Sequence, residues 1–219
     1  MIPKILLQIS KDPLPQYVQD MWQRRIDDSW KIYWFDDAKI IEYFENNPLH
    51  EFPNIKEVFN SFEKGAHKAD LFRYYFMYIN GGIFVDSDAM THIVLNEIVN
   101  NDIEYFFTIS QLQMNDLRNA NGCIFNGFYG CIPKSDLVYD LLKNCYSTNP
   151  KSLNRFYLYF TCVMYDIVTK YKPNKAKYYY EDRCSIDGTI SYIRDRTVDT
   201  TICSHYNTTK IIPYDIELK

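Results

Sequence analysis

The stretch that decides the fold is GGIFVDSD at residues 81–88, together with GAHKADLFRY at residues 65–74 upstream of it. Two glycines permit a tight turn, and the short apolar run after them predicts a fully buried strand. Asp86 and Asp88 follow where that strand ends. Ligands bind at the carboxyl ends of strands in open α/β sheets, and alternation along the strand would place both carboxylates on one side. The stretch therefore predicts a binding edge that carries two carboxylates.

Outward from this stretch, helical and strand patterns alternate along the chain. Helical periodicity predicts helices over residues 17–26, 38–45, 55–62, 66–80, 136–145 and 156–171. Apolar runs predict strands over residues 4–9, 31–35, 83–85 and 103–109, with a bent or bulged pair over 123–132. The last forty residues predict short strands and loops, with Tyr178–Tyr180 favoured as an edge strand over a sugar-stacking face. This order predicts a single α/β domain over residues 1–219, with a Rossmann-like, mixed but mostly parallel sheet flanked by helices.

Composition narrows the class of protein. The 219 residues are 47% hydrophobic and 24% charged, as in globular proteins, and the net charge of −4 argues against a nucleic-acid partner. The longest apolar run, residues 71–79, is too short to span a membrane, and the chain opens without a cleavable signal, so a soluble cytoplasmic protein is expected. The six cysteines contain no C-x-x-C pair, which predicts reduced, buried thiols. Twenty tyrosines against seven glycines fit an AT-rich genome, as in large DNA viruses or some bacteria.

The two aspartates suit a divalent metal ion. Hard carboxylate oxygens are the ligands that Mg²⁺ and Mn²⁺ prefer. A D-x-D pair alone is a weak signal, because 19 aspartates in 219 residues give about 1.6 such pairs by chance. Asp70 and Arg73 strengthen it, since they lie three residues apart on one face of the helix that leads into the glycine turn. An ordinary ion pair within the helix is the alternative for these two residues.

The segment of residues 68–74, taken with residues 81–88, resembles the signature of the DXD glycosyltransferases of family 32. This family includes the yeast outer-chain mannosyltransferases, with the glucosylating clostridial toxins as more distant relatives. IPKILLQI at residues 2–9, FNGF at 125–128 and CSHY at 203–206 resemble other family segments more loosely. The resemblance implies a GT-A fold, a nucleotide-sugar donor with UDP as the first choice, a divalent metal that is commonly Mn²⁺, and retention of anomeric configuration.

The resemblance also implies roles for individual residues. Asp86 would contact the donor and the metal shell, and Asp88 would ligate the metal directly. Asp70 and Arg73 would hold hydroxyl groups of the donor sugar, so these four acidic and basic residues are the candidate catalytic group. His205 would approach the metal and the diphosphate from the C-terminal part of the chain.

Further residues would border the nucleotide by the same resemblance. Gln8 and Ile9 would flank the base from the first strand, Phe84 would pack beside the nucleotide, and Asn126 would touch the donor or the acceptor. Two features of the family are missing: the histidine that precedes Gln8 in many relatives, and the tryptophan two residues after it. The three tryptophans of this chain lie on apolar patterns and are expected in the core.

The expected function is metal-dependent transfer of a sugar from a nucleoside-diphosphate donor to a glycan or another hydroxyl acceptor. The chemistry is coherent, because a metal at the two aspartates would neutralise the charge that develops on the departing diphosphate. Two alternatives stay open. A haloacid-dehalogenase-type phosphatase would use Asp86 as a nucleophile, although Met90 stands where that family has threonine or valine. The other alternative is a catalytically silent sugar-binding module.

Overall fold

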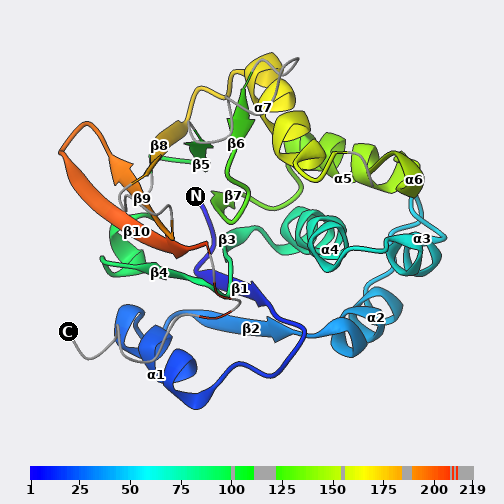
Figure 1. The fold of residues 1–219 in the computed structure, drawn as a ribbon, viewed down its shortest axis with the longest axis horizontal. Helices are drawn as coiled ribbons and strands as arrows, with labels where there is room; N and C mark the ends of the chain where they lie inside the picture. Colours follow the sequence, from blue (N-terminus) through cyan, green and yellow to red (C-terminus); the bar gives the residue numbers. More distant parts are fainter. Residues whose placement is uncertain are drawn as a thin grey trace.

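The computed structural model describes residues 1–99, 102–110, 122–153, 156–183, 189–207, 209 and 211. Its centre is a ten-stranded sheet in the order β2-β1-β3-β7-β5-β8-β9-β10-β4, with β6 paired to β5 (Figure 1). The strands are β1 (Ile5–Ile9), β2 (Lys31–Phe35), β3 (Gly82–Val85), β4 (Ala89–Thr91), β5 (Tyr105–Ser110), β6 (Cys123–Ile124), β7 (Phe128–Cys131), β8 (Ala176–Arg183), β9 (Ile190–Asp195) and β10 (Thr200–Tyr206). The helices are α1 (Gln16–Arg25), α2 (Asp37–Asn46), α3 (Ile55–Ser61), α4 (Gly65–Asn80), α5 (Asp136–Ser147), α6 (Pro150–Leu153), α7 (Tyr159–Tyr171) and the short 3₁₀ helix η1 (Leu95–Glu97).

Local sequence signals explain the N-terminal half of this order. Asp36 caps α2, since its side chain accepts a hydrogen bond of 2.9 Å from the backbone N–H of Lys39. Gly81 ends α4 with φ of 65°, and Gly82 begins β3 with φ of 110°, values that glycine adopts without strain. The predictions for β1, β2, β3 and the first four helices are confirmed to within one or two residues, whereas α7 begins at Tyr159 rather than at residue 156.

The prediction of a mostly parallel sheet is wrong, although the sheet is mixed as expected. Parallel pairing joins β1 to β2, β1 to β3 and β5 to β8, and the other pairings of the described strands are antiparallel. Helices connect the strands that pair in parallel, whereas β8, β9 and β10 follow one another through short connections and pair antiparallel. β6 and β7 both run antiparallel to β5, and β7 also runs antiparallel to β3. Tyr178–Tyr180 is a strand but not an edge strand, because β8 lies between β5 and β9.

Two hydrophobic cores lie on the two faces of the sheet. Along β1 and β3, neighbouring residues alternate between them: Leu6 and Ile83 join one cluster, Leu7 and Phe84 the other. The first cluster packs under α1, and the second under α2 to α7, which Figure 1 shows grouped on one side of the sheet. The segment that follows β3 thus starts from a strand that is buried on both faces.

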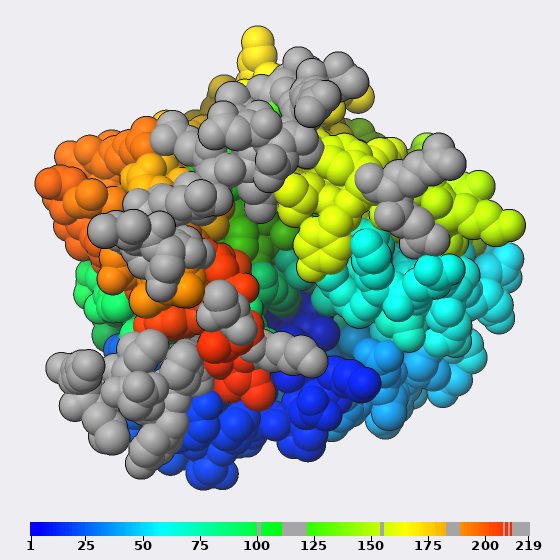
Figure 2. All heavy atoms as spheres, in the orientation of Figure 1, coloured from blue at the N-terminus to red at the C-terminus, as the bar shows by residue number. Residues whose placement is uncertain are grey.

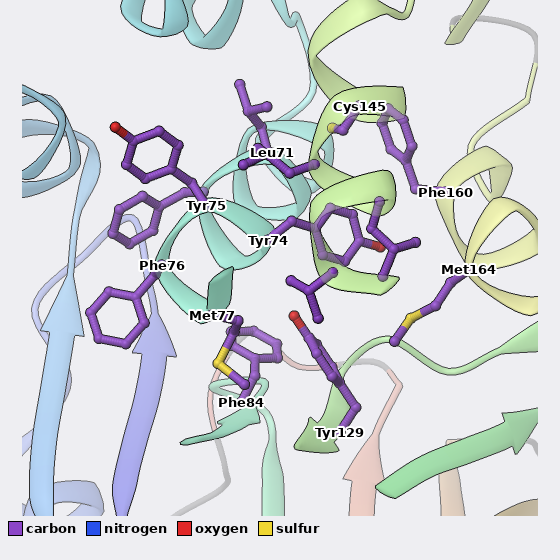
Figure 3. Close-up of a cluster of buried hydrophobic side chains, with 14 of the residues drawn as sticks. Leu71, Tyr74, Tyr75, Phe76, Met77, Phe84, Tyr129, Cys145, Phe160 and Met164 are labelled. Carbon is purple, nitrogen blue, oxygen red and sulfur yellow. The ribbon is translucent and has the colours of Figure 1, made fainter. Parts of the chain in front are cut away.

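The second core fixes α4, the helix that carries Asp70 and Arg73. Its residues from position 70 to 77 are all buried. Figure 3 shows Tyr74, Tyr75 and Phe76 projecting from different sides of this helix, with Phe84 and Tyr129 of the sheet beneath it. Because so much of its circumference is packed, α4 holds its polar side chains in a fixed place relative to β3.

The cysteines that the structure describes are buried and free, as predicted: Cys123, Cys131, Cys145, Cys162 and Cys203. Cys184 lies outside the described residues. None of the helices in the described ranges combines the length and the apolar character needed to cross a lipid bilayer.

Candidate metal and donor site

The two aspartates of the D-x-D stretch lie in a turn between β3 and β4. β3 ends at Val85, and the backbone N–H of Ala89 donates to the carbonyl oxygen of Asp86 at 3.0 Å. This turn brings the carboxylates of Asp86 and Asp88 together, so the expectation that strand alternation would do so is wrong. After the turn, β4 pairs antiparallel with β10, which carries the chain's last described histidine into the same place.

His205 stands beside Asp88 because of that pairing. It lies opposite Ala89 in the register, and the backbone N–H of Tyr206 donates to the carbonyl oxygen of Asp88 at 2.9 Å. His205 Nε2 is 3.3 Å from Asp88 Oδ1. Burial lowers the pKa of His205, but the hydrogen bond with Asp88 and the charges of the neighbouring carboxylates outweigh burial, so the pKa is raised overall.

Asp86, Asp88 and His205 form a cluster that fits a divalent metal. Each offers one ligand atom, and these atoms all lie within 4.8 Å of one another. Two carboxylates and an imidazole are a suitable donor set for Mn²⁺, and the carboxylates also suit Mg²⁺. Three protein ligands leave open positions in an octahedral shell, as substrate phosphates require. The residues that the sequence singled out as metal ligands are therefore the ones that the fold brings together.

Arg73 is the centre of a second, buried group behind this cluster. Its Nη2 lies 3.5 Å from Asp86 Oδ1 and 3.6 Å from Asp70 Oδ1. Its Nη1 donates to the backbone carbonyl of Asn126 at 2.5 Å, and the guanidinium carbon sits 4.1 Å from the centre of the Phe84 ring. One side chain of α4 thereby ties together the end of β3 and the loop between β6 and β7.

Asp70 and Asn126 complete that buried group. Asn126 Nδ2 donates to Asp70 Oδ1 at 2.6 Å, and the side chains of Asp70 and Arg73 are only 9% and 5% exposed. Burial raises the pKa of Asp70, and the Arg73 charge opposes this effect. The two residues do form the ion pair that was the alternative interpretation, and Arg73 of this pair also holds Asp86. Direct contact of either residue with a donor sugar stays a prediction.

The residues expected to border the nucleotide, Gln8, Ile9 and Phe84, have different surroundings. Gln8 is fully buried, and its Nε2 donates to the carbonyl oxygen of Asp86 at 3.5 Å. Ile9 ends β1 and lies opposite Phe35 of β2. Phe84 is 1% exposed, and its ring packs against the Arg73 guanidinium. Its contact with a nucleotide stays a prediction.

A cavity of about 240 Å³ lies at the carboxyl ends of β1 and β2, next to this group. Trp34, Asp36 and Lys39 are among the residues that line it. Trp34 is only partly buried, unlike the core residue expected from sequence, and its Nε1 donates to Gln8 Oε1 at 3.1 Å. Gln8 thus connects the cavity to Asp86. Figure 2 shows a separate hollow near the centre of the face drawn, between red atoms of the C-terminal part and cyan atoms, with dark blue atoms of the N-terminal part behind it.

Sequence reasoning missed the part that glycine plays here. The backbone N–H of Asp86 donates to the carbonyl oxygen of Gly127 at 2.8 Å. A Cβ atom at Gly127 would collide with the Asp86 carboxylate and with the Phe125 ring. Phe125 in turn packs against the imidazole of His205, with ring centres 4.6 Å apart. The Asn-Gly pair in the quoted FNGF segment was the available signal, but it predicts only a turn.

Tyr157 is a second residue that no sequence pattern indicated. The residue is 55% exposed, and its backbone carbonyl oxygen lies 3.1 Å from His67 Nε2. Its pKa is raised by partial burial and then by the negative charges of Asp70, Asp86 and Asp88.

The pKa of Asp86 gives a prediction for the metal-free protein. Burial raises this pKa from 3.8 to about 6, with Arg73 opposing the shift and Asp88 adding to it. Between these values the folded state holds a proton that the unfolded state has released, so the free energy of unfolding falls as the pH rises from about 4 to about 6. Urea unfolding in EDTA at about pH 4.5 and about pH 7 should show a smaller fall for Asp86→Asn than for the wild type. An identical fall in both proteins would contradict the shift.

Two comparisons with known proteins agree with this geometry. The model of the family described as "Glycosyltransferase sugar-binding region containing DXD motif" matches residues 14–105, a range that includes β3 and both aspartates. The chain is also 25% identical, over 179 residues, to an uncharacterized glycosyltransferase of Acanthamoeba polyphaga mimivirus, and the match covers 80% of this chain and 67% of the viral protein. Together with the site, these similarities support glycosyl transfer as the general class of activity.

Proposed function

We propose that this chain transfers a sugar from a nucleoside-diphosphate donor, with a UDP-sugar as first choice, to a hydroxyl of a glycan or another acceptor. The observation that carries the proposal is the convergence of Asp86, Asp88 and His205 in the turn between β3 and β4. A hexose as the sugar, Mn²⁺ or Mg²⁺ as the metal and retention of configuration belong to the proposal. The proposal also includes a GT-A type of fold in one domain, membership of glycosyltransferase family 32 and action in the cytoplasm.

The chemistry assigns a role to each part of the site. Asp86, Asp88 and His205 would hold the divalent ion, which supplies Lewis-acid neutralisation of the charge on the departing diphosphate. Arg73 holds the Asp86 carboxylate through an ion pair at 3.5 Å, and Asp70 holds Arg73 in turn through an ion pair at 3.6 Å. A retaining reaction at the front face of the sugar requires no nucleophile from the protein, so the chain needs only to position the donor, the acceptor and the ion.

The cavity beside β1 and β2 supports a place for the nucleoside. It lies at the same edge of the sheet as Asp86, and ligands in open α/β sheets bind at this edge. Trp34 offers an aromatic surface there, which replaces the tryptophan that family members carry two residues after Gln8. Tyr157 is exposed, and its ring is suited to stack against a sugar of the acceptor.

The experiment is the shift in melting temperature with UDP and with GDP, each in Mn²⁺ and again in EDTA. A ligand that binds only the native state at about 100 times its Kd adds roughly 2.7 kcal/mol to the free energy of unfolding. We expect a rise with UDP that disappears in EDTA, and slow release of UDP from a UDP-hexose. A rise with GDP alone would replace UDP by GDP in the proposal.

The two alternatives give different results in the same assays. Phosphate release from a monoester, without any nucleotide-dependent rise, would move the assignment to a phosphatase in which Asp86 is the nucleophile. Asp86 is held by Arg73 at 3.5 Å, which does not favour that role. A rise with a nucleotide sugar that never leads to turnover would indicate a silent sugar-binding module.

A further inference from the structure

We infer that Glu181 is a positioning residue for His205: its carboxylate accepts the Nδ1 proton of the imidazole, so that Nε2 is presented to the metal. The inference rests on the metal site of the proposed function. It adds a residue to which neither the sequence pattern nor the similarity to known proteins assigns a role.

Glu181 is a carboxylate buried inside the sheet. It lies on β8, an interior strand, and is 2% exposed. Ser110 Oγ of β5 donates to its Oε2 at 2.5 Å, and Ser191 Oγ of β9 donates to its Oε1 at 2.8 Å. Both oxygens are therefore fixed by hydroxyl groups from the flanking strands, and each retains capacity for one more hydrogen bond.

The imidazole of His205 has the complementary need. Its Nδ1 is buried and has no hydrogen-bond partner among the residues that the structure describes. That nitrogen lies 4.0 Å from Glu181 Oε1. Ser191 stands opposite His205 in the β9–β10 register, so the serine that holds Oε1 also lies next to the histidine. The acceptor and the donor thus lie 4.0 Å apart, just beyond hydrogen-bond distance.

Physical chemistry favours closing that gap. Burying an imidazole N–H without a partner costs free energy that a hydrogen bond to the Glu181 carboxylate recovers. A histidine that binds a metal through one nitrogen usually donates its other ring N–H to a carboxylate or carbonyl, which fixes the tautomer and the ring orientation. Phe125, packed on the ring at 4.6 Å, limits the other orientations of the imidazole.

The groups that face His205 come from several elements. Asp88 and Asp86 lie on the side of Nε2, in the turn after β3, and Glu181 lies on the side of Nδ1, from β8. The ring therefore stands between the metal ligands and a buried carboxylate, which is the arrangement of a carboxylate–histidine–metal relay. The other explanation is that Glu181 attracts a cation only through its charge, without orienting the ring.

The test measures Mn²⁺ affinity without nucleotide, by titration calorimetry or by the electron paramagnetic resonance of free Mn²⁺. We expect Glu181→Gln to weaken Mn²⁺ binding by about 10- to 100-fold. Glu181→Asp keeps the negative charge but moves the carboxylate away from the imidazole, and we expect a similar loss of Mn²⁺ affinity. An affinity equal to that of the wild type would favour the pure charge effect and overturn the inference. Asp195→Asn is the matched control, because Asp195 is an equally buried carboxylate at the other end of β9 that pairs with Lys177 instead. Its Mn²⁺ affinity should equal that of the wild type.

A double-mutant cycle separates orientation from charge. In the His205→Gln background, Glu181→Gln should change Mn²⁺ affinity no further, because the residue acts through the imidazole. A second loss of the same size in that background would overturn the inference. If Glu181→Gln does not fold, Ser191→Ala removes only the hydroxyl that holds Oε1, and a smaller loss in the same direction is expected.

The outcomes also distinguish this inference from the proposed function. Wild-type protein that fails to bind Mn²⁺ would overturn both. Wild-type binding that Glu181→Gln leaves unchanged would overturn the role of Glu181 alone and leave the metal site standing.

Discussion

Replacing Asp88 with alanine is expected to abolish metal-dependent nucleotide binding while the protein stays folded. Asp88 contributes one of three clustered ligand atoms, so its loss leaves Asp86 and His205 with too few donors. Turnover should fall by on the order of 10²–10³-fold, the size of effect seen when one electrostatic stabiliser of a transition state is removed. The measurement is the melting-temperature rise with nucleotide and Mn²⁺, followed by turnover of the nucleotide sugar.

The fold should tolerate this change for a specific reason. The backbone carbonyl of Asp88 accepts the Tyr206 N–H of β10 at 2.9 Å, and this bond remains in the alanine variant, which loses only the side-chain contact with His205. Removing a carboxylate from a cluster of negative charge also relieves repulsion with Asp86. Asp140→Ala, on the surface of α5, serves as the control and should keep both nucleotide binding and turnover. Full activity in Asp88→Ala would contradict the assignment of Asp86, Asp88 and His205 as the metal site.

The fold could be predicted where the signals are local. Helical periodicity, the Asp36 cap and the glycine pair at 81–82 act over a few residues, and β1 to β3 with the first four helices follow from them. β4 escaped prediction because it has three residues and pairs with β10, more than a hundred residues later in the chain. The direction of the C-terminal strands depends on such long-range pairing, which no local pattern records.

The site was predictable in part for the same reason. The position of Asp86 and Asp88 directly after a buried strand indicates a binding site, whereas His205 was predicted only through a family resemblance. Glu181 gave no signal, because an acidic residue in a polar-looking strand suggests a solvated position. Its burial follows from the position of β8 between β5 and β9, with Ser110 opposite it in the register.

The structure also changes how the Asp70–Arg73 pair is understood. The sequence opposed two interpretations, donor binding and an ordinary ion pair within α4. Arg73 contacts Asp86 as well as Asp70. One guanidinium therefore makes the ion pair within α4 and also holds the Asp86 carboxylate of the metal cluster. A variant of Arg73 should therefore affect stability and activity together.

Arg73→Lys is expected to lower the free energy of unfolding by about 1–3 kcal/mol, because a single ammonium cannot make all the contacts of the guanidinium. It can approach Asp70 or Asp86, but it cannot also donate to the Asn126 carbonyl and stack on Phe84. Turnover should fall by about 10- to 100-fold, the usual effect of removing a group that orients a metal ligand. Urea unfolding and turnover at saturating donor measure the two effects.

Arg196→Lys is the matched control for this change. Arg196 also pairs with an aspartate, Asp182 at 2.7 Å, and also lies over an aromatic ring, that of Tyr180 at 4.2 Å, but its side chain is 43% exposed. Because water replaces lost contacts at the surface, Arg196→Lys should change the free energy of unfolding by less than about 0.5 kcal/mol and leave turnover intact. Near-normal turnover in a destabilised Arg73→Lys would reduce Arg73 to a structural ion pair. A large loss of turnover at full stability would instead show that Arg73 touches the donor directly.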